Sequence, residues 1–485
     1  MRSAGVWAGL ERAALRSRDR RRHVQPGERP DPARPPGTDL LPQIKHIVVL
    51  MMENHSFDNY LGTLGRGDGL PVGDDGAPDA ANPDASGAMI GAYRMRTTSQ
   101  LEGVPSQSWS ASHEEWADGK LNGFVTATER IKPTADKAIG MGYWTADELP
   151  FYHGLARTFP LADRWFCSCL GPTFPNRRFL LAGTANGLID DLPFNLLDRP
   201  AAGTIMDSLT RHGISWVNYR PAASDQSEFR RYIQYRSRRV RHHIQSLGRP
   251  FRTETSEFKH DLQITAALYP LGFTRYMAHI RSIDSFFADA DAGSLPSFCI
   301  VDPDFHNYSE ENPQDIRKGE SFAAEVISRV MHGRGWPDTL LIWLYDEHGG
   351  YYDHVAPPAA PPPDDVHGRS VVTDPGPVNR VLRVVFPGYV RTAELLDAGP
   401  RQYDTYGFRV PAVIVSPYAR PDCVLSDLFD HTAVLRLVED KWNLPALTRR
   451  DATATSPIGA LDLSAPPAFL TPPELPAPSL AWGSW

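Results

Sequence analysis

Five short apolar runs, separated by longer polar stretches, are the clearest pattern along the chain. They cover residues 44–52, 213–219, 295–301, 339–345 and 410–416. Runs that are apolar at successive positions are typical of strands buried on both faces of a parallel sheet. Between them, residues recur with helical spacing, as in Trp109, His113 and Trp116 at i, i+4 and i+7. The sequence therefore predicts an α/β fold with a central, mostly parallel β-sheet flanked by helices on both faces.

Two of these runs end abruptly in ionisable groups. Glu53 and Asn54 follow the first run, and Asp346 and Glu347 follow the fourth. Open α/β sheets bind ligands at the carboxyl ends of their strands, and carboxylates beside an amide oxygen suit a hard or borderline cation. Helix capping is an alternative for the first motif. For Asp346 and Glu347, the free-energy cost of burying unpaired charges favours a functional role over a structural one.

A third motif, Gly171-Pro-Thr173-Phe-Pro-Asn-Arg177-Arg178, leads from a loop into an apolar helix. Thr173 lies at or just before the predicted cap, in the positive end of the helix dipole among unpaired N–H groups. That place would bind a phosphate and favour an ionised nucleophile, and Arg177 follows one turn later. The alternative is a plain threonine cap followed by surface arginines.

If the two strand ends lie centrally in one sheet, their carboxylates converge on a single cation, and Thr173 becomes a metal-activated nucleophile towards phosphorus. Histidines supply candidates for protonating the leaving oxygen, at positions 113, 348, 354 and 431 (His113, His348, His354, His431). For His113, an aromatic packing face with an incidental histidine is an equally good interpretation.

Composition narrows the class of protein. The 485 residues include 50 basic and 58 acidic side chains, so the net charge of −8 argues against a nucleic-acid binder. No apolar run approaches the length that crosses a bilayer. Arginines near the N-terminus are not followed by the apolar segment of a secretory signal, so we expect a cytoplasmic protein, although many bacterial relatives of the family named below are exported.

We divide the chain into three parts. Residues 1–41 are an Arg- and Pro-rich arm expected to be disordered, residues 42–450 form the catalytic domain, and residues 451–485 are an Ala- and Pro-rich tail. A basic insertion at about residues 225–255 interrupts the domain. It is more typical of a solvated face, but a peripheral contact with anionic lipid is compatible with it.

Three segments carry a resemblance to a known family: 47–59, 171–177 and 346–354, with weaker matches at Ser108-Trp109, Asn312-Pro313 and Asp430-His431-Thr432. Over roughly residues 42–450 the chain resembles the phosphoesterase family of bacterial phospholipases C, plant non-specific phospholipases C and related acid phosphatases. The resemblance implies an alkaline-phosphatase-like fold. It also implies one divalent metal held by Glu53, Asn54, Asp346 and Glu347.

In that family pattern Thr173 completes the metal site and attacks phosphorus, and water resolves the phosphothreonine intermediate. Two positions depart from the pattern. Gln107 and Asn312 stand where many members carry histidines of the phosphate pocket, so either neighbouring His113 and His306 replace them or activity and headgroup preference differ.

The expected function is phospholipase C-type hydrolysis of phospholipids to diacylglycerol and a phosphorylated headgroup. The alternatives are an acid phosphatase on small phosphomonoesters and a catalytically impaired homologue that binds phosphate or lipid. The sequence leaves the metal's identity and the oligomeric state open.

Overall fold

The computed structural model describes residues 25–101, 103–191, 199–221, 265, 268, 275–305 and 307–484. The basic insertion predicted at 225–255 lies outside these residues. So does His306, which was considered as a replacement for a family histidine. So do the first 24 residues of the predicted arm.

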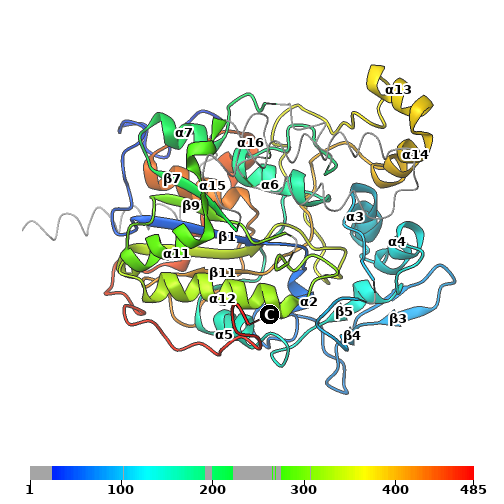
Figure 1. Cartoon of the computed structure of the whole chain (residues 1–485), viewed down its shortest axis with the longest axis horizontal. Helices are drawn as coiled ribbons and strands as arrows, with labels where there is room; N and C mark the ends of the chain where they lie inside the picture. The colour runs from blue at the N-terminus through cyan, green and yellow to red at the C-terminus, as the bar shows by residue number, and fades with distance from the viewer. Residues whose placement is uncertain are drawn as a thin grey trace, which may run out of the picture.

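A central sheet of eight strands organises the molecule (Figure 1). β1 (His46–Met52) lies in its middle, parallel to β10 (Thr339–Tyr345) on one side and to β9 (Phe298–Val301) on the other. The order is β12-β6-β11-β10-β1-β9-β7-β8, with β6 (Leu161–Ala162), β7 (Trp216–Arg220), β8 (Ile280–Ser282), β11 (Ala412–Val415) and β12 (Val424–Leu425). Within this sheet only β11 runs antiparallel to its neighbours. The prediction of a mostly parallel sheet is confirmed.

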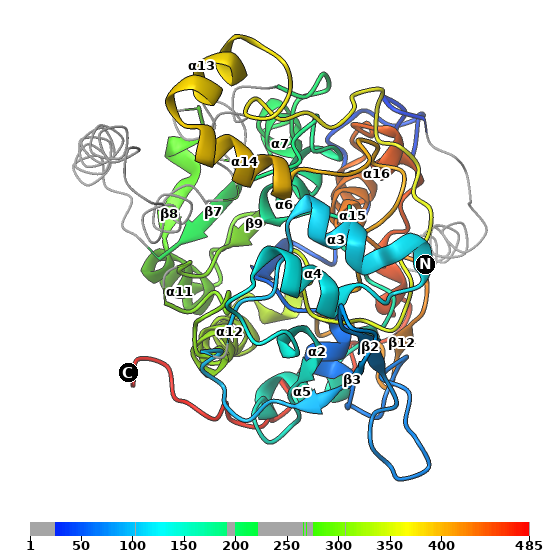
Figure 2. The same cartoon turned by 90° about the vertical axis from the view of Figure 1, so that its right-hand side faces the viewer.

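Helices cover both faces of the sheet, which explains why the strands read as continuous apolar runs. In Figures 1 and 2 one face carries α5 (Pro150–Thr158), α11 (Ile283–Ala292) and α12 (Ile316–His332). The other carries α6 (Thr173–Ala182), α7 (Ile205–Arg211), α15 (Thr432–Trp442) and α16 (Arg449–Thr453). All seven residues of β10 are buried, as are six of the seven in β1. The α/β architecture is thus the predicted one.

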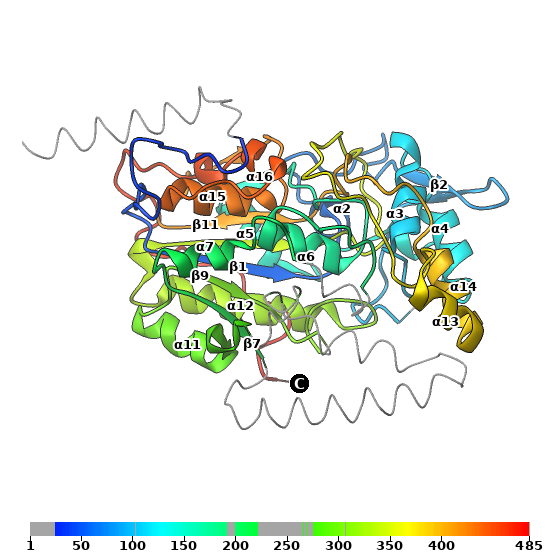
Figure 3. The ribbon, with the colours of Figure 1, turned by 90° about the horizontal axis from the view of Figure 1, so that it is seen from above.

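Smaller elements gather beyond the carboxyl ends of β1 and β10, on the right of Figure 3. They include α2 (Phe57–Leu61), α3 (Trp109–Trp116), α4 (Phe124–Ile131), α13 (Pro377–Val385) and α14 (Pro387–Leu396). Two short strand pairs join them: β2 (Ala81–Pro83) with β3 (Met89–Gly91), and β4 (Tyr93–Arg94) with β5 (Gly142–Tyr143). These elements surround the sheet edge at which the sequence places the functional site.

The two ends of the described chain lie against the domain. In the predicted arm, Asp31 N donates to Asn443 Oδ1 (2.8 Å) and Leu40 N to the Lys441 carbonyl oxygen (2.6 Å), so residues 25–41 contact the end of α15. In the predicted tail, the Trp482 ring packs on Tyr308 and Phe322. The three-part division of the chain stays a prediction. No helix in the described ranges is both long and apolar enough to cross a membrane.

A buried carboxylate, Glu310, holds the elements behind this edge together. It accepts hydrogen bonds from Tyr60 of α2 (3.0 Å), Tyr152 of α5 (2.7 Å) and Tyr345 at the end of β10. Burial raises the pKa of Glu310 to about 8, although the tyrosine hydroxyls oppose that shift. The folded protein therefore favours the protonated carboxyl over most of the physiological pH range.

We expect the folding stability that Glu310 contributes to fall as pH rises. Because the folded pKa is raised, the contribution is complete below the unfolded pKa and is lost as pH passes through about 8. Glu310→Gln, which is neutral at every pH, should therefore reduce the loss of stability between pH 6 and pH 8 by about 2 kcal/mol. Urea unfolding across that range measures it, with the exposed Glu474→Gln as the control. Equal pH slopes for wild type and Glu310→Gln would contradict the prediction.

Candidate active site

The predicted metal-ligating residues lie together at the ends of β1 and β10. The two strands pair in register from His46 with Thr339 to Met52 with Tyr345, so Glu53 and Asp346 leave the sheet side by side. Asp346 Oδ1 accepts the backbone N–H groups of Asn54 (3.2 Å) and Glu347 (2.8 Å). Glu53, Asn54, Asp346 and Glu347 are all buried. The two strand-end motifs therefore lie at the same edge of the sheet, and their convergence on a single cation stays a prediction.

The loops that follow the two strands are in close contact. Asn54 adopts a positive φ of 69°, and Gly349 has a φ of 70°. A Cβ atom on Gly349 would lie 2.0 Å from the Asn54 carbonyl oxygen, so only glycine fits there. The contact brings the backbone of the second motif directly against that of the first.

Several oxygens at these strand ends have no hydrogen-bond partner in the described part of the chain. They are both carboxylate oxygens of Glu53, Asn54 Oδ1 and Glu347 Oε1. Burial, together with Glu311 and Asp346 nearby, raises the pKa of Glu53 well above its usual value, although the Arg177 guanidinium and the Ser309 hydroxyl act in the opposite direction. Burial likewise raises the pKa of Glu347 to about 8 and that of Asp346 to about 6. A buried set of carboxylate and amide oxygens without donors fits a hard divalent cation.

Arg177 connects the strand ends to α6. Its guanidinium is fully buried and donates from Nε to Asp346 Oδ2 (2.8 Å) and from Nη1 to Asp302 Oδ1 (2.9 Å). Its Nη2 lies 3.3 Å from the carbonyl oxygen of Met52. Because Asp302 follows β9, this one side chain binds the ends of three neighbouring strands. The alternative of surface arginines is wrong, since Arg177 and Arg178 are both buried.

Thr173 begins α6 and is not its N-cap. Pro172 occupies the cap position without a side-chain hydrogen bond, so the plain threonine cap is not what forms. Thr173 is buried and lies one helical turn before Arg177, on the same helix face. Since Arg177 contacts Asp346, this face is the one that faces the strand ends. The next amide, Phe174 N, donates to Asp191 Oδ1 (2.8 Å).

Asn176 fixes the loop that leads into α6, a role not anticipated from the sequence. Its Oδ1 accepts from Ser168 N (2.8 Å) and Cys169 N (3.0 Å), and its Nδ2 donates to the Gly171 carbonyl oxygen (2.8 Å). An asparagine in a helix interior gives no sequence signal of bonding backward to the preceding loop.

His348 lies between two carboxylates. Its Nε2 is 2.7 Å from Glu115 Oε2, and its Nδ1 is 3.4 Å from Glu347 Oε2. Burial opposes the charged ring, but Glu115 and Glu347 outweigh it and raise the pKa of His348 to about 9. Glu115 was missed in the sequence, because the neighbouring Glu114 in α3 has the same side chain and only packing distinguishes the buried one.

Two further predicted histidines, His431 and His113, have different surroundings. His431 Nε2 donates to the Asp346 carbonyl oxygen (2.6 Å), while Trp165 Nε1 lies 3.4 Å from its Nδ1. Burial lowers the pKa of His431 to about 4, so the ring is neutral. His113 bonds through Nδ1 to the Trp109 carbonyl oxygen in its own helix (2.7 Å), and burial lowers its pKa. The structure thus brings His431 to the strand end and leaves His113 on α3.

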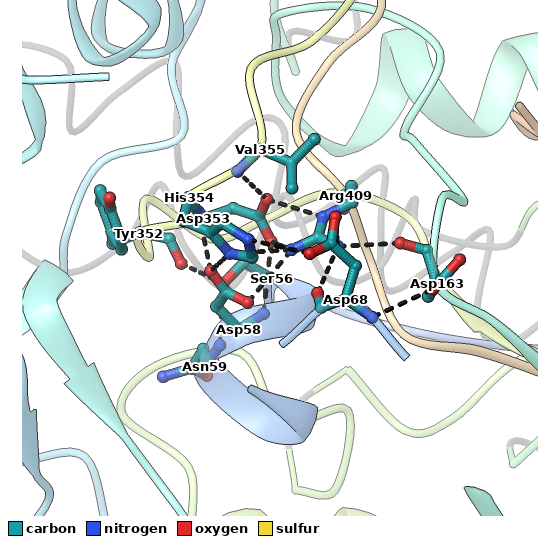
Figure 4. Close-up of polar contacts among 10 residues, drawn as sticks. All are labelled: Ser56, Asp58, Asn59, Asp68, Asp163, Tyr352, Asp353, His354, Val355 and Arg409. Atoms are coloured by element: carbon teal, nitrogen blue, oxygen red, sulfur yellow. Dashed lines mark hydrogen bonds and ion pairs between the residues drawn. The ribbon is translucent and has the colours of Figure 1, made fainter. Parts of the chain in front are cut away.

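His354 belongs to a second acidic cluster, shown in Figure 4. Its Nδ1 lies 2.7 Å from Asp58 Oδ2, and its Nε2 lies 3.3 Å from Asp68 Oδ1. In the described ranges one group of three potential metal ligands (histidine, cysteine, aspartate or glutamate) has its ligand atoms within 4.8 Å of one another. It consists of Asp58, Asp353 and His354. The strand-end carboxylates of Glu53, Asp346 and Glu347 are therefore more widely spread than this second set.

Compactness alone does not make the second cluster a metal site. The buried Arg409 guanidinium lies within it, donating to Asp353 Oδ1 (2.8 Å) and to Asp58 Oδ1 (3.1 Å) (Figure 4). A positive charge thus already sits where a cation would bind. At the strand ends Arg177 binds Asp346, but the oxygens of Glu53, Asn54 and Glu347 lack hydrogen-bond donors. The strand-end set is the better fit to a metal ion.

Asn312, one of the two departures from the family pattern, is also held at this edge. Its Nδ2 donates to the hydroxyl of Tyr351 (2.9 Å) and to the Gly103 carbonyl oxygen (3.1 Å). Gln107 accepts a hydrogen bond from Ser112 through its backbone oxygen (3.3 Å). Asn312 therefore contacts the segment that follows the Asp346–Gly350 motif.

Comparison with known proteins agrees with this geometry. The family model of the Phosphoesterase family matches residues 44–445, which is most of the chain and includes every residue of the candidate site. This chain is a member of the phosphoesterase family. The resemblance inferred from the three motifs is confirmed. This protein is therefore a hydrolase that acts on phosphoric esters.

Curated relatives of this phosphoesterase come from bacteria and plants. Phospholipase C A of Mycobacterium tuberculosis is 28% identical over 467 residues, covering 91% of this chain and 80% of that protein. Non-specific phospholipase C3 of Arabidopsis thaliana is 25% identical over 467 residues, covering 89% and 76%. Non-hemolytic phospholipase C of Pseudomonas aeruginosa is 26% identical over 430 residues, covering 83% and 54%.

Removal of Arg177 should destabilise the phosphoesterase strongly. Arg177→Met leaves Asp346 and Asp302 buried beside each other without a counter-charge, which typically costs about 3–5 kcal/mol. Urea unfolding measures the loss, and Arg334→Met at an exposed position is the control. The double variant Arg177→Met with Asp302→Asn removes one stranded charge and should recover part of the loss. A loss below about 1 kcal/mol would show that the guanidinium is not needed to hold the strand ends.

Proposed function

We propose that this phosphoesterase hydrolyses phospholipids in the manner of a phospholipase C, with one divalent metal ion at the ends of β1 and β10 and Thr173 as nucleophile. The observation that carries the site is the buried set of oxygens on Glu53, Asn54 and Glu347 that lack hydrogen-bond donors. The substrate class is supported by relatives named phospholipase C that align along most of this chain. We also assign the sheet to the alkaline-phosphatase-like superfamily, on its mostly parallel order and its strand-end site.

Glu53, Asn54, Asp346 and Glu347 would hold the metal ion, and Thr173 would complete the site. When bound, the ion polarises a phosphoryl oxygen and favours the ionised form of a hydroxyl beside it. The protein orients these groups beforehand. Asp346 is fixed by Arg177 and two backbone amides, and Glu347 accepts from Gly349 N (2.7 Å) and lies beside His348.

The reaction proceeds in two displacements at phosphorus. Thr173 Oγ1 passes its proton to solvent and attacks phosphorus. The bond to the glycerol oxygen breaks, and that oxygen takes a proton from the donor named below, releasing diacylglycerol. Water then attacks the phosphothreonine, returns the hydroxyl to Thr173 and releases the phosphorylated headgroup. Arg177 holds α6 against the strand ends, so that the nucleophile faces the metal ligands throughout.

The four histidines take different parts in this proposal. His348 and His431 act as positioning residues, because His348 is engaged by Glu115 and Glu347 and His431 by the Asp346 carbonyl oxygen. His354 keeps a side chain that is 16% exposed, and Asp58 and Asp353 raise its pKa against the effect of burial. It is the proton donor we favour, a role commonly worth about 10²–10⁴ in rate. His113 is assigned no step, because its Nδ1 bonds to the Trp109 carbonyl oxygen within α3.

Thr173→Ala should remove nearly all turnover, on the order of 10³-fold or more, because the covalent intermediate cannot form. The measurement is diacylglycerol release from phosphatidylcholine beside hydrolysis of p-nitrophenyl phosphate and its phosphocholine diester. Thr453→Ala, a helical threonine outside the site, is the matched control. A near-normal rate for Thr173→Ala would require water to attack directly. Turnover of the monoester alone by wild type would make the enzyme a phosphatase.

Metal content should distinguish the two acidic clusters. Wild type should purify with about one divalent ion per chain, and Glu347→Gln should lower that ratio because it removes a charged ligand. Asp353→Asn should leave the ratio unchanged, since Arg409 already neutralises that cluster. Elemental analysis of protein verified as folded by circular dichroism gives the ratio. The opposite pattern would place the ion beside His354 and remove the proposed site.

A further inference from the structure

The helix α13 turns its apolar face away from the rest of the described protein. Four valines lie between 44% and 83% exposed, a high value for large apolar side chains: Val378, Val381, Val384 and Val385. Of the ten exposed large apolar side chains in the described ranges, these four and Leu395 of α14 make up half. Exposed apolar residues are common singly, but a cluster on adjoining helices marks an interaction surface.

The opposite face of α13 is attached to the protein through Asn379 and through the half-buried Leu382, which packs against Val372, Val390 and Ala393. Asn379 is buried, donates from Nδ2 to the Val372 carbonyl oxygen and accepts from Arg383 Nε (3.0 Å). Arg383 in turn pairs with Glu394 of α14. An ordinary surface helix buries its apolar stripe and exposes its polar one. In α13 the aliphatic Leu382 packs inward and the four valines face outward, so folding of the described residues does not explain why the valines are apolar.

Positive charge accompanies the exposed valines. Arg380 and Arg391 are exposed, and the two helices carry three arginines against the single acid Glu394. The whole chain has a net charge of −8, so this local excess of arginine runs against the composition of the molecule. Valines that face outward beside arginines match the layered chemistry of an anionic bilayer surface, where acyl chains lie beneath charged headgroups.

The two helices lie at the end of the molecule that carries the active site. Figures 1 and 3 show α13 and α14 beyond the carboxyl ends of the central strands, projecting from the body of the molecule. α14 packs on α3, where Ser110 Oγ donates to the Leu395 carbonyl oxygen (2.6 Å) and Trp109 Nε1 to that of Pro400 (2.7 Å). The same α3 supplies Glu115, the partner of His348. A membrane that contacts α13 would therefore lie at the same end of the molecule as the strand-end site.

We propose that α13 docks this enzyme on phospholipid bilayers that contain anionic lipid. The valine face enters the boundary between headgroups and acyl chains, and Arg380 and Arg391 bind headgroup phosphates. The proposal rests on the proposed function, because it supplies the contact through which a phospholipase C would reach an aggregated substrate. Binding to vesicles is nevertheless a separate readout from hydrolysis.

The test compares the full-length wild type with a triple variant, Val381→Ser with Val384→Ser and Val385→Ser. The matched control places the same number of serines at similarly exposed apolar positions elsewhere: Val72→Ser, Met89→Ser and Leu470→Ser. Co-flotation with vesicles of phosphatidylcholine, alone or mixed with phosphatidylglycerol, measures binding. Turnover of the soluble phosphocholine ester of p-nitrophenol is measured beside it, and size-exclusion chromatography gives the oligomeric state.

We expect wild type and control to bind the anionic vesicles, and the triple variant to bind on the order of tenfold less or weaker still, with turnover of the soluble ester unchanged. Arg380→Gln with Arg391→Gln should remove the preference for phosphatidylglycerol. Equal vesicle binding by wild type and triple variant, or none by wild type, would overturn the proposal. A wild-type dimer that dissociates in the triple variant would also overturn it, because a second copy would then cover the valines. So would a lower unfolding midpoint of the triple variant than of wild type, because the valines would then be packed within the chain.

Failure of the proposed function looks different. Vesicle binding that depends on the valines, without hydrolysis of any phospholipid, would support the docking surface and reject phospholipase activity. Hydrolysis of detergent-dispersed phospholipid by wild type and triple variant alike, without vesicle binding, would reject the docking surface alone.

Discussion

The ion pairs of Arg177 make the acidic edge of this sheet possible. Three neighbouring parallel strands end in acids, and parallel strands deliver those acids to the same edge with the same sign of charge. A buried guanidinium that bonds Asp346 and Asp302 together offsets their mutual repulsion while its remaining N–H groups lie near strand carbonyl oxygens. Lysine has one ammonium group and could not reach these partners at fixed angles, so the position requires arginine.

The buried carboxylates at that edge do not all have hydrogen-bond donors. Asp346 accepts hydrogen bonds from Arg177 and two amides, whereas Glu53 and Glu347 keep oxygens without a hydrogen-bond donor in the described residues. A few residues away, Arg409 satisfies Asp58 and Asp353 in a closed network. Two clusters of similar composition thus differ in charge balance. The incomplete one is the set to which we assign the cation, and in the complete one Arg409 balances the two aspartates.

Apolar runs predicted β1, β7, β9, β10 and β11, whereas the short strands β6, β8 and β12 were not predicted. The acidic strand ends indicated a candidate site, since parallel strands share an edge. Thr173 stays a candidate nucleophile, indicated by the loop-to-helix transition before it. Sequence spacing did not show that β11 runs antiparallel, because direction depends on the connection rather than on the strand. The partners of His431 and the burial of Glu115 were also hidden, since both depend on contacts between segments far apart in the chain. The four outward valines of α13 depart from the usual rule, because helical periodicity alone would place an aliphatic face against the core.

The close contact between Asn54 and Gly349 has a consequence for how such enzymes can diverge. The backbone of one loop fills the space that any other side chain at position 349 would need, so neither loop has a conformation independent of the other. Exchange of one loop between relatives would bring in a segment shaped for a different neighbour. The two loops must be transplanted together, as a single inherited unit, even though nearly three hundred residues separate them in the chain.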